Sequence, residues 1–183
     1  GAKSKIMSTV LGVRAEVHFA PILKDCPTFG DINGFMYNHG FELLNLDYDG
    51  RGSARSPFTL PNKFGKLMST DGVWIISSKR LFDPNSRDIA KDTIRMALFL
   101  MLNNATDVAL EVLLRAVEKE GVSYAAFSDD PLFLNLNKRI ALLFKEISYL
   151  PSMEMSRIQD AYKKIFGNDF PVLNDFYESF FFD

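Results

Sequence analysis

The sequence predicts an α/β part followed by an all-helical part, because its pattern changes near residues 83–86. Before that point, Gly and Pro recur every few residues and the apolar runs are short and rich in Val, Ile and Phe, which is typical of strands and turns. After it, Gly is rare and apolar residues recur at helical spacing. We therefore expect an α/β unit of three or four strands over residues 1–86, and a subdomain of about five helices over residues 87–183.

Composition and charge exclude several classes of protein. Of the 183 residues, 47% are hydrophobic and 24% are charged, as in globular domains that bury a core. The formal net charge of −2 gives no basic surplus for binding nucleic acid or an anionic membrane surface. No apolar run approaches the roughly 18 residues of a transmembrane helix. We therefore expect neither a nucleic acid nor a membrane as a partner.

The cysteine count bears on compartment and on metal sites. Cys26 is the single cysteine, which excludes an internal disulfide and a multi-cysteine metal site, and no clustered His, Asp and Glu spacing supports another metal site. A reducing compartment is the simpler interpretation, and no secretory signal is visible, so we expect a cytoplasmic protein. Gly1, with no Met before it, is typical of a residue left by tag removal and favours a piece of a longer gene product.

Residues 13–20 alternate apolar and polar side chains with a period of two, which predicts a strand with one buried face. Pro21 ends this strand because it has no N–H to donate to a neighbouring strand. The apolar face consists of Val13, Ala15, Val17 and Phe19, and the polar face of Arg14, Glu16 and His18.

A helix and two further strands follow. Apolar residues spaced by three and four predict a short amphipathic helix over residues 29–39, which Gly40 ends. Residues 41–48 predict a second strand. We expect a long polar loop from Asp49 to Thr70, the most mobile internal segment, after which Asp71-Gly72 opens a third strand over residues 73–78.

The second part carries helix start and stop signals. Ser86 is expected to cap a helix that runs to about Asn104, and its segment 96–102 is apolar all round, which predicts a central position. Thr106 is expected to cap a second helix, with Glu111 and Arg115 paired on its exposed side. The remaining three helices are predicted to start at Pro131, Ser152 and Pro171, and the second of these ends at Gly167.

Three short segments of the first part resemble one enzyme family. Residues 15–21 (AEVHFAP), residues 27–29 (PTF) and residues 39–43 (HGFEL) are similar, in order and spacing, to the C-terminal third of FkbM-like methyltransferases. The resemblance covers about residues 10–80, and residues 87–183 carry no motif of that family. Leu23 and Cys26 depart from the family pattern, which usually has Tyr and Gln at these positions.

The resemblance implies the C-terminal part of a doubly wound, methyltransferase-like sheet. Residues 13–20 would be its fifth strand, residues 29–39 the following helix, and residues 41–48 and 72–79 the last two strands, with the final strand antiparallel. It implies methyl transfer from S-adenosylmethionine to a small hydroxyl-bearing acceptor. The family holds this cofactor with a Gly-rich turn and an acidic residue on the first four strands, which have no counterpart here. We therefore expect no cofactor site in this chain, and no activity from it alone.

Glu16 and His18 are the candidate catalytic residues. They lie two apart on one strand face, near its C-terminal end, where ligands of open α/β sheets usually bind. A His beside a carboxylate could act as the general base that takes a proton from the acceptor hydroxyl. The alternative is that both are ordinary polar residues of a sheet surface.

Other candidates have weaker support. Arg51 and Arg55 could bind a phosphate or an acidic substrate, although a solvated loop is the simpler interpretation. Cys26 is interpreted as a turn residue and His39 as a helix C-terminal residue.

An alternative function is a non-catalytic interaction or dimerisation module derived from a methyltransferase fold. The strand over residues 13–19 would be an open sheet edge, and the helical part is rich in apolar residues, including Phe176 and Phe180–Phe182 near its end. Either the helices fold back over this edge within one chain or a second copy covers it; we expect the second copy, and hence a homodimer.

Overall fold

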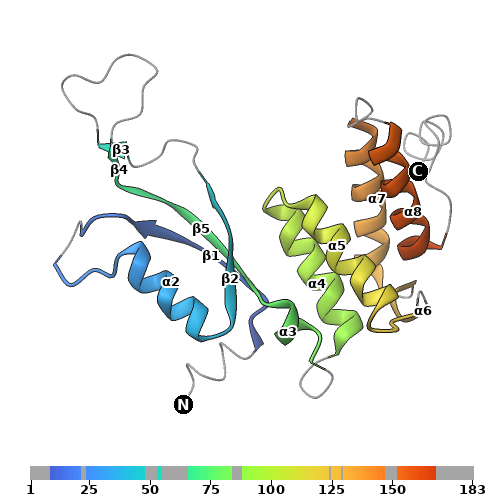
Figure 1. The fold of residues 1–183 in the computed structure, drawn as a ribbon, viewed down its shortest axis with the longest axis horizontal. Helices are drawn as coiled ribbons and strands as arrows, with labels where there is room; N and C mark the ends of the chain where they lie inside the picture. Colours follow the sequence, from blue (N-terminus) through green and yellow to red (C-terminus); the bar gives the residue numbers. More distant parts are fainter. Residues whose placement is uncertain are drawn as a thin grey trace. The chain divides into compact units, whose positions relative to one another are not determined.

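The structure is a computed structural model. It describes residues 9–21, 24–47, 53–54, 66–83, 88–123, 125–128, 130–146 and 152–167. The chain divides into two compact units, Gly1–Leu81 and Phe82–Asp183. Over the described residues the fold is mixed α/β, with seven helices, a three-stranded antiparallel sheet and one short strand pair (Figure 1).

The sheet of the first unit has the order β1-β5-β2. Its strands are β1 (Gly12–His18), β2 (Phe41–Asp47) and β5 (Ser69–Ile76). Both outer strands pair with β5 in antiparallel orientation, so β1 and β2 run parallel to each other. The predicted antiparallel pairing of the second and third strands is therefore confirmed. The sequence did not indicate that β1 also pairs with β5.

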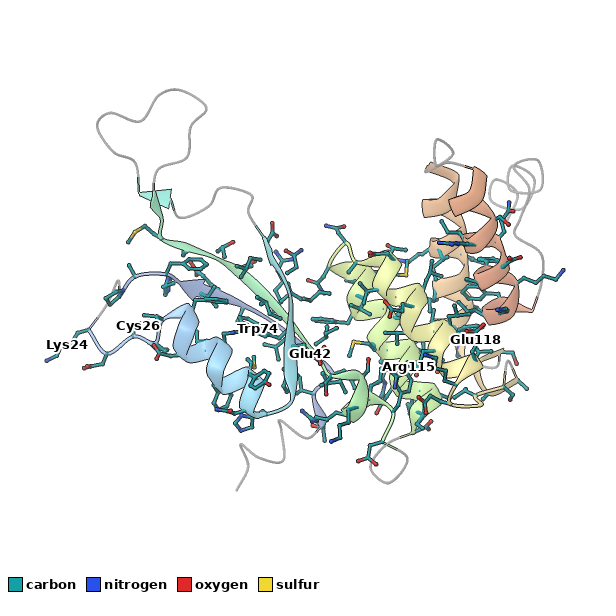
Figure 2. All side chains as sticks on the ribbon, in the orientation of Figure 1. Lys24, Cys26, Glu42, Trp74, Arg115 and Glu118 are labelled. Carbon is teal, nitrogen blue, oxygen red and sulfur yellow. The ribbon has the colours of Figure 1, made fainter. Side chains whose placement is uncertain are left out.

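Helix α2 (Phe29–Asn38) covers the apolar face of this sheet (Figure 1). The ring of Phe29 lies 5.3 Å from that of Phe19 and 6.4 Å from the indole of Trp74, which is fully buried. The indole Nε1 of Trp74, a residue labelled in Figure 2, donates a hydrogen bond of 3.0 Å to Asn33 Oδ1 on the helix. On β1, Val17 is fully buried, so the predicted alternation is confirmed.

Strand β5 begins at Ser69, before the predicted opening of the third strand at Asp71-Gly72, so both of these residues lie within the strand. Gly72 pairs with Ala15 on one side and with Leu46 on the other, so it lies inside the ladder. The reason is steric: a Cβ on Gly72 would lie 2.3 Å from the Trp74 ring, so only glycine fits beneath that indole.

Part of the predicted polar loop is ordered into two short strands. Strand β3 (Ser53–Ala54) pairs with β4 (Lys66–Leu67) in antiparallel orientation. Most of the expected loop, including the segment predicted to be mobile, lies outside the described residues.

The ends of α2 follow from local chemistry. At its start, Asp31 Oδ2 accepts hydrogen bonds from the N–H (2.8 Å) and the hydroxyl (2.7 Å) of Thr28. At its end, His39 is the C-cap and Gly40 takes a φ of 75°, as predicted for a glycine stop. The short helix α3 (Ser78–Leu81) follows β5, and the Arg80 side chain donates to the His39 carbonyl.

The second unit is helical. Its elements are α4 (Ile89–Leu102), α5 (Thr106–Glu118), α6 (Ala125–Ser128), α7 (Pro131–Glu146) and α8 (Ser152–Phe166). Helix α4 contacts α5, α6 and α7, and its Met96, Ala97 and Leu100 are buried, so its predicted central position is confirmed. The predicted starts at Pro131 and Ser152 and the stop at Gly167 agree with the structure. The helix predicted from Pro171 lies outside the described residues.

Three local details of the helical unit differ from expectation. Helix α4 is capped by Asp88, whose carboxylate accepts from the Lys91 N–H at 3.2 Å, rather than by Ser86. The N-cap of α5 is Ala105, and Thr106 is its first helical residue. Arg115 does not pair with Glu111. Its guanidinium instead stacks on a buried aromatic ring and forms an ion pair with another glutamate. Its contacts are the Phe82 ring, 4.7 Å from the centroid, and Glu120 Oε1, at 3.3 Å.

Candidate functional site

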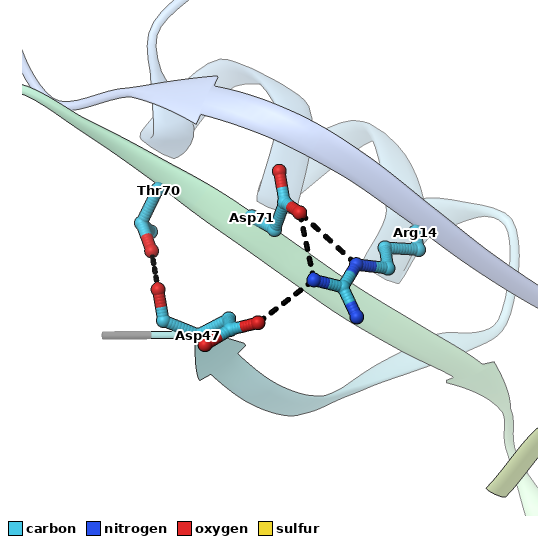
Figure 3. A network of polar contacts seen from close by, with 4 residues as sticks. All are labelled: Arg14, Asp47, Thr70 and Asp71. Carbon is cyan, nitrogen blue, oxygen red and sulfur yellow. Dashed lines mark hydrogen bonds and ion pairs between the residues drawn. The ribbon is translucent and has the colours of Figure 1, made fainter. Parts of the chain in front are cut away.

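A polar cluster lies on the sheet face opposite α2, where β1 and β2 end and β5 begins. Arg14, Asp47 and Asp71 come from the three strands, and the guanidinium of Arg14 joins both carboxylates (Figure 3). Its Nη2 lies 2.7 Å from Asp47 Oδ2 and 2.8 Å from Asp71 Oδ2, and its Nε donates to Asp71 Oδ2 at 3.0 Å. The Thr70 hydroxyl donates to the backbone carbonyl of Asp47.

The strand register explains why these three side chains meet. Asp71 is the cross-strand partner of Asp47 on one side and of Glu16 on the other, and cross-strand partners share a face of the sheet. Arg14, two residues before Glu16, reaches diagonally across β5. The hydrogen bond to Asp71 is the main cause that raises the pKa of Arg14, and Asp47 adds to it. All three side chains are more than a third exposed, so solvent screens these ion pairs.

Glu16 and His18 lie on the same face as this cluster, as the alternation predicted. Glu16 is exposed. His18 is half-buried and lies opposite Ser69, and its Nδ1 is buried without a hydrogen-bond partner among the described residues. No hydrogen bond between described residues joins Glu16 to His18. The structure therefore places both at the carboxyl end of β1, beside a paired arginine that the sequence analysis did not single out.

The other candidate residues do not join this cluster. Arg51 and Arg55 lie outside the described residues. Cys26 is a half-buried free thiol between β1 and α2 (Figure 2). His39 ends α2, where its Nδ1 lies 2.8 Å from the Phe35 carbonyl.

The described residues offer little for a metal ion, because no group of three or more His, Cys, Asp or Glu side chains among them could hold one. Among these residues, the polar face presents one imidazole, that of His18, and carboxylates that can accept hydrogen bonds.

The sequence carried a signal for one of the three missed members of the cluster. Arg14 falls on the polar face together with Glu16 and His18, so its position was visible. Asp71 precedes the third predicted strand and Asp47 lies near the end of the second, and neither was indicated to lie beside the strand of Arg14. Both carboxylates could be assigned only once the pairing of β5 with both strands was known.

Among the helices of the described residues, none combines the length and the apolar character needed to cross a lipid bilayer. No protein-family model matches the chain, no curated protein is significantly similar to it, and no solved structure matches it.

Proposed function

We propose that residues 10–80 form the C-terminal part of the sheet of an FkbM-like S-adenosylmethionine-dependent O-methyltransferase. The observation that carries this proposal is the topology of the first unit. Two parallel strands, β1 and β2, are joined by α2, and the last strand, β5, lies between them in antiparallel orientation. The resemblance of the motifs implied a strand, a helix and two more strands with the last one antiparallel. This agreement between the order and direction of the strands and what the motifs implied supports the proposal.

The chain's own residues do not fit the cofactor. The sequence has no strand followed by a Gly-rich turn that opens a helix, which is the arrangement that lets a backbone approach such a ligand. The chain's contribution to methyl transfer would therefore lie on the acceptor side. At the carboxyl end of β1, His18 is the group that can take the proton of an acceptor hydroxyl, and Glu16 is the nearby carboxylate that can orient that hydroxyl.

Calorimetric titration with S-adenosylmethionine tests this proposal on two proteins. For this chain we expect no binding tighter than about 100 μM, roughly −5.5 kcal/mol. Where the gene encodes an in-frame strand–Gly-x-Gly–helix segment upstream of residue 2, we expect the chain extended by that segment to bind the cofactor and to transfer methyl to a hydroxyl. Tight binding to this chain, or no binding to the extended protein, would overturn the proposal.

Within the extended protein, the acceptor-side role is tested separately. His18→Gln should lower the rate of methyl transfer while the affinity for S-adenosylmethionine stays unchanged, because His18 belongs to a part of the sheet that does not hold the cofactor. A change in affinity without a change in rate would contradict that role.

The second candidate function is a non-catalytic interaction module. It is favoured by β1, a regular edge strand that has no strand of the described residues on its outer side. The gene sequence upstream of residue 2 discriminates the two candidates. A strand–Gly-x-Gly–helix segment in frame favours the enzyme, and a start codon at or near residue 2 favours the module.

A further inference from the structure

The two edges of the three-stranded sheet differ in how open they are to another strand. The ladder between β2 and β5 is irregular between Leu43 and Asn45, where Leu44 is an extra residue. The ladder between β1 and β5 continues without a break from Gly12 to His18. Natural sheets blunt their edges with bulges, Pro and charged side chains; β1 has no bulge and no Pro, and its two charged residues, Arg14 and Glu16, are of opposite sign. Of the two edges, β1 is the one built to accept a strand.

The hydrogen-bond phase of β1 shows which backbone groups face outward. Phe19 N–H donates to the Met68 carbonyl at 2.8 Å, and the Leu11 carbonyl accepts from Ile76 N–H at 2.8 Å. In an antiparallel pair, alternate residues direct both backbone groups toward the same neighbour. The odd-numbered residues of β1 therefore face β5, and the even-numbered residues direct their N–H and C=O away from it. These outward residues are Gly12, Arg14, Glu16 and His18.

We propose that a second copy of this chain pairs with β1 across a two-fold axis at Ala15, so that the two sheets become one. In this register each outward residue meets an outward residue, and Arg14 lies opposite Glu16 of the partner subunit. Centring the axis on Arg14 or on Glu16 instead would place two like charges directly opposite each other, which is unfavourable. Only the register at Ala15 uses all four outward residues and also pairs opposite charges.

The side chains on both faces suit this register. On the polar face, Glu16 lies opposite Asp71 within its own sheet, and the partner subunit's Arg14 offsets that repulsion. Arg14 can keep its contacts with Asp47 and Asp71 while the carboxylate of the partner subunit's Glu16 comes close to it. On the apolar face, Val13 and Ala15 are only half-buried in one chain and gain cover from the paired strand. Closed two-fold pairing is also the commonest symmetry of soluble oligomers.

This inference rests on the second candidate function, and sedimentation of the full chain at micromolar concentration tests it. We expect a species of twice the chain mass of 20.7 kDa. Glu16→Arg places like charges opposite each other twice and should weaken the dimer at least tenfold. The matched control is Glu42→Arg, the same charge change at an exposed residue of the other edge strand, which should leave the dimer unchanged (Figure 2). A chain that sediments at 20.7 kDa overturns the proposal.

The register itself is tested by cross-linking in a Cys26→Ser background. Ala15→Cys should form an intermolecular disulfide on oxidation, because directly opposed residues at a non-hydrogen-bonded position lie about 4.5 Å apart at Cα, within disulfide range. Val13→Cys should not, since it would lie opposite Val17 of the partner subunit. A dimer that cross-links through Val13→Cys and not through Ala15→Cys overturns this register. The titration with S-adenosylmethionine tests the methyltransferase proposal separately, so failure of the pairing leaves that proposal standing.

Discussion

The indole of Trp74 lies directly over Gly72, two residues earlier on the same face of β5. A Cβ built on Gly72 would lie 2.3 Å from Trp74 Cη2 and 2.7 Å from Cζ3, distances at which one of the two groups must move. Trp74 is fully buried and is held by its hydrogen bond to Asn33. The glycine therefore makes room for the largest side chain of the sheet core.

Gly72→Ala is expected to destabilise the protein by about 1–3 kcal/mol, because the new methyl group overpacks a site that the buried indole already fills. The measurement is the urea midpoint of unfolding, with the m-value checked for change. Gly34→Ala is the matched control: it lies within α2, and a Cβ there meets nothing within 4 Å. That variant should gain about 0.5–1 kcal/mol from helix propensity. Equal stability of the two variants would contradict this account.

Phe133→Ala is expected to cost about 3–5 kcal/mol, the usual range for removing a fully buried ring. Phe133 lies between Phe127 on α6, at 5.1 Å, and Phe166 on α8, at 5.0 Å, so its loss opens a cavity among three helices. The neighbouring Leu134 is 51% exposed, and Leu134→Ala should change stability by less than about 0.5 kcal/mol. Chemical denaturation of both variants provides the measurement, and similar losses would show that Phe133 is not central to the core.

The contribution of Asp31 to the stability of α2 is expected to change with pH in the acid range. The hydroxyl and the N–H of Thr28 donate to its carboxylate and lower the pKa of Asp31 below the usual 3.8. A carboxyl whose folded pKa is lowered contributes stability above its unfolded pKa and loses it as the pH falls through the folded value. Asp31→Asn should therefore reduce stability at pH 7, and the difference from the wild type should shrink below about pH 3.8.

Thr28→Val supplies a second variant for the same bond. It removes one of the two donors, so the pKa of Asp31 should rise toward 3.8. An NMR titration of the carboxyl carbon measures this directly. An unchanged pKa would mean that the backbone N–H alone holds the carboxylate.

Glu118 and Lys164 join α5 to α8, with 2.5 Å between Oε1 and Nζ. The hydrogen bond and the charge of Glu118 raise the pKa of Lys164 above its usual 10.5. A raised lysine pKa contributes stability below the unfolded value and loses it as the pH rises through the folded one. Glu118→Gln should therefore lower stability at neutral pH, and the difference should vanish well above pH 10.5 and in high salt.

The control for this ion pair is Glu111→Gln, which removes the same charge from an exposed residue of the same helix. Thermal unfolding at several pH values compares the two variants. If Glu111→Gln reproduced the pH dependence of Glu118→Gln, the effect would belong to net charge rather than to the contact.

Much of the local structure could be predicted because it depends on neighbouring residues. The period-two alternation of residues 13–19 indicated which face of β1 is buried, since successive side chains of a strand point to opposite faces. The glycine stops at Gly40 and Gly167 and the start at Pro131 followed from backbone preferences of those residues alone. The cap of α4 was not predicted: Ser86 was expected, and the structure has Asp88, whose carboxylate accepts from the Lys91 N–H.

The tertiary structure decided the sheet order and the polar cluster. Arg14 is 33 residues from Asp47 and 57 from Asp71, and no periodicity within one segment encodes which distant strand will lie alongside it. The Asp71-Gly72 pair has the composition of a turn, yet the pairing of β5 with two strands and the packing of Trp74 over Gly72 keep it extended. The conformational preference of a residue determines which backbone conformations are favourable for it in isolation. At Gly72, burial of the Trp74 indole and pairing with a strand on each side outweigh that preference in the folded sheet.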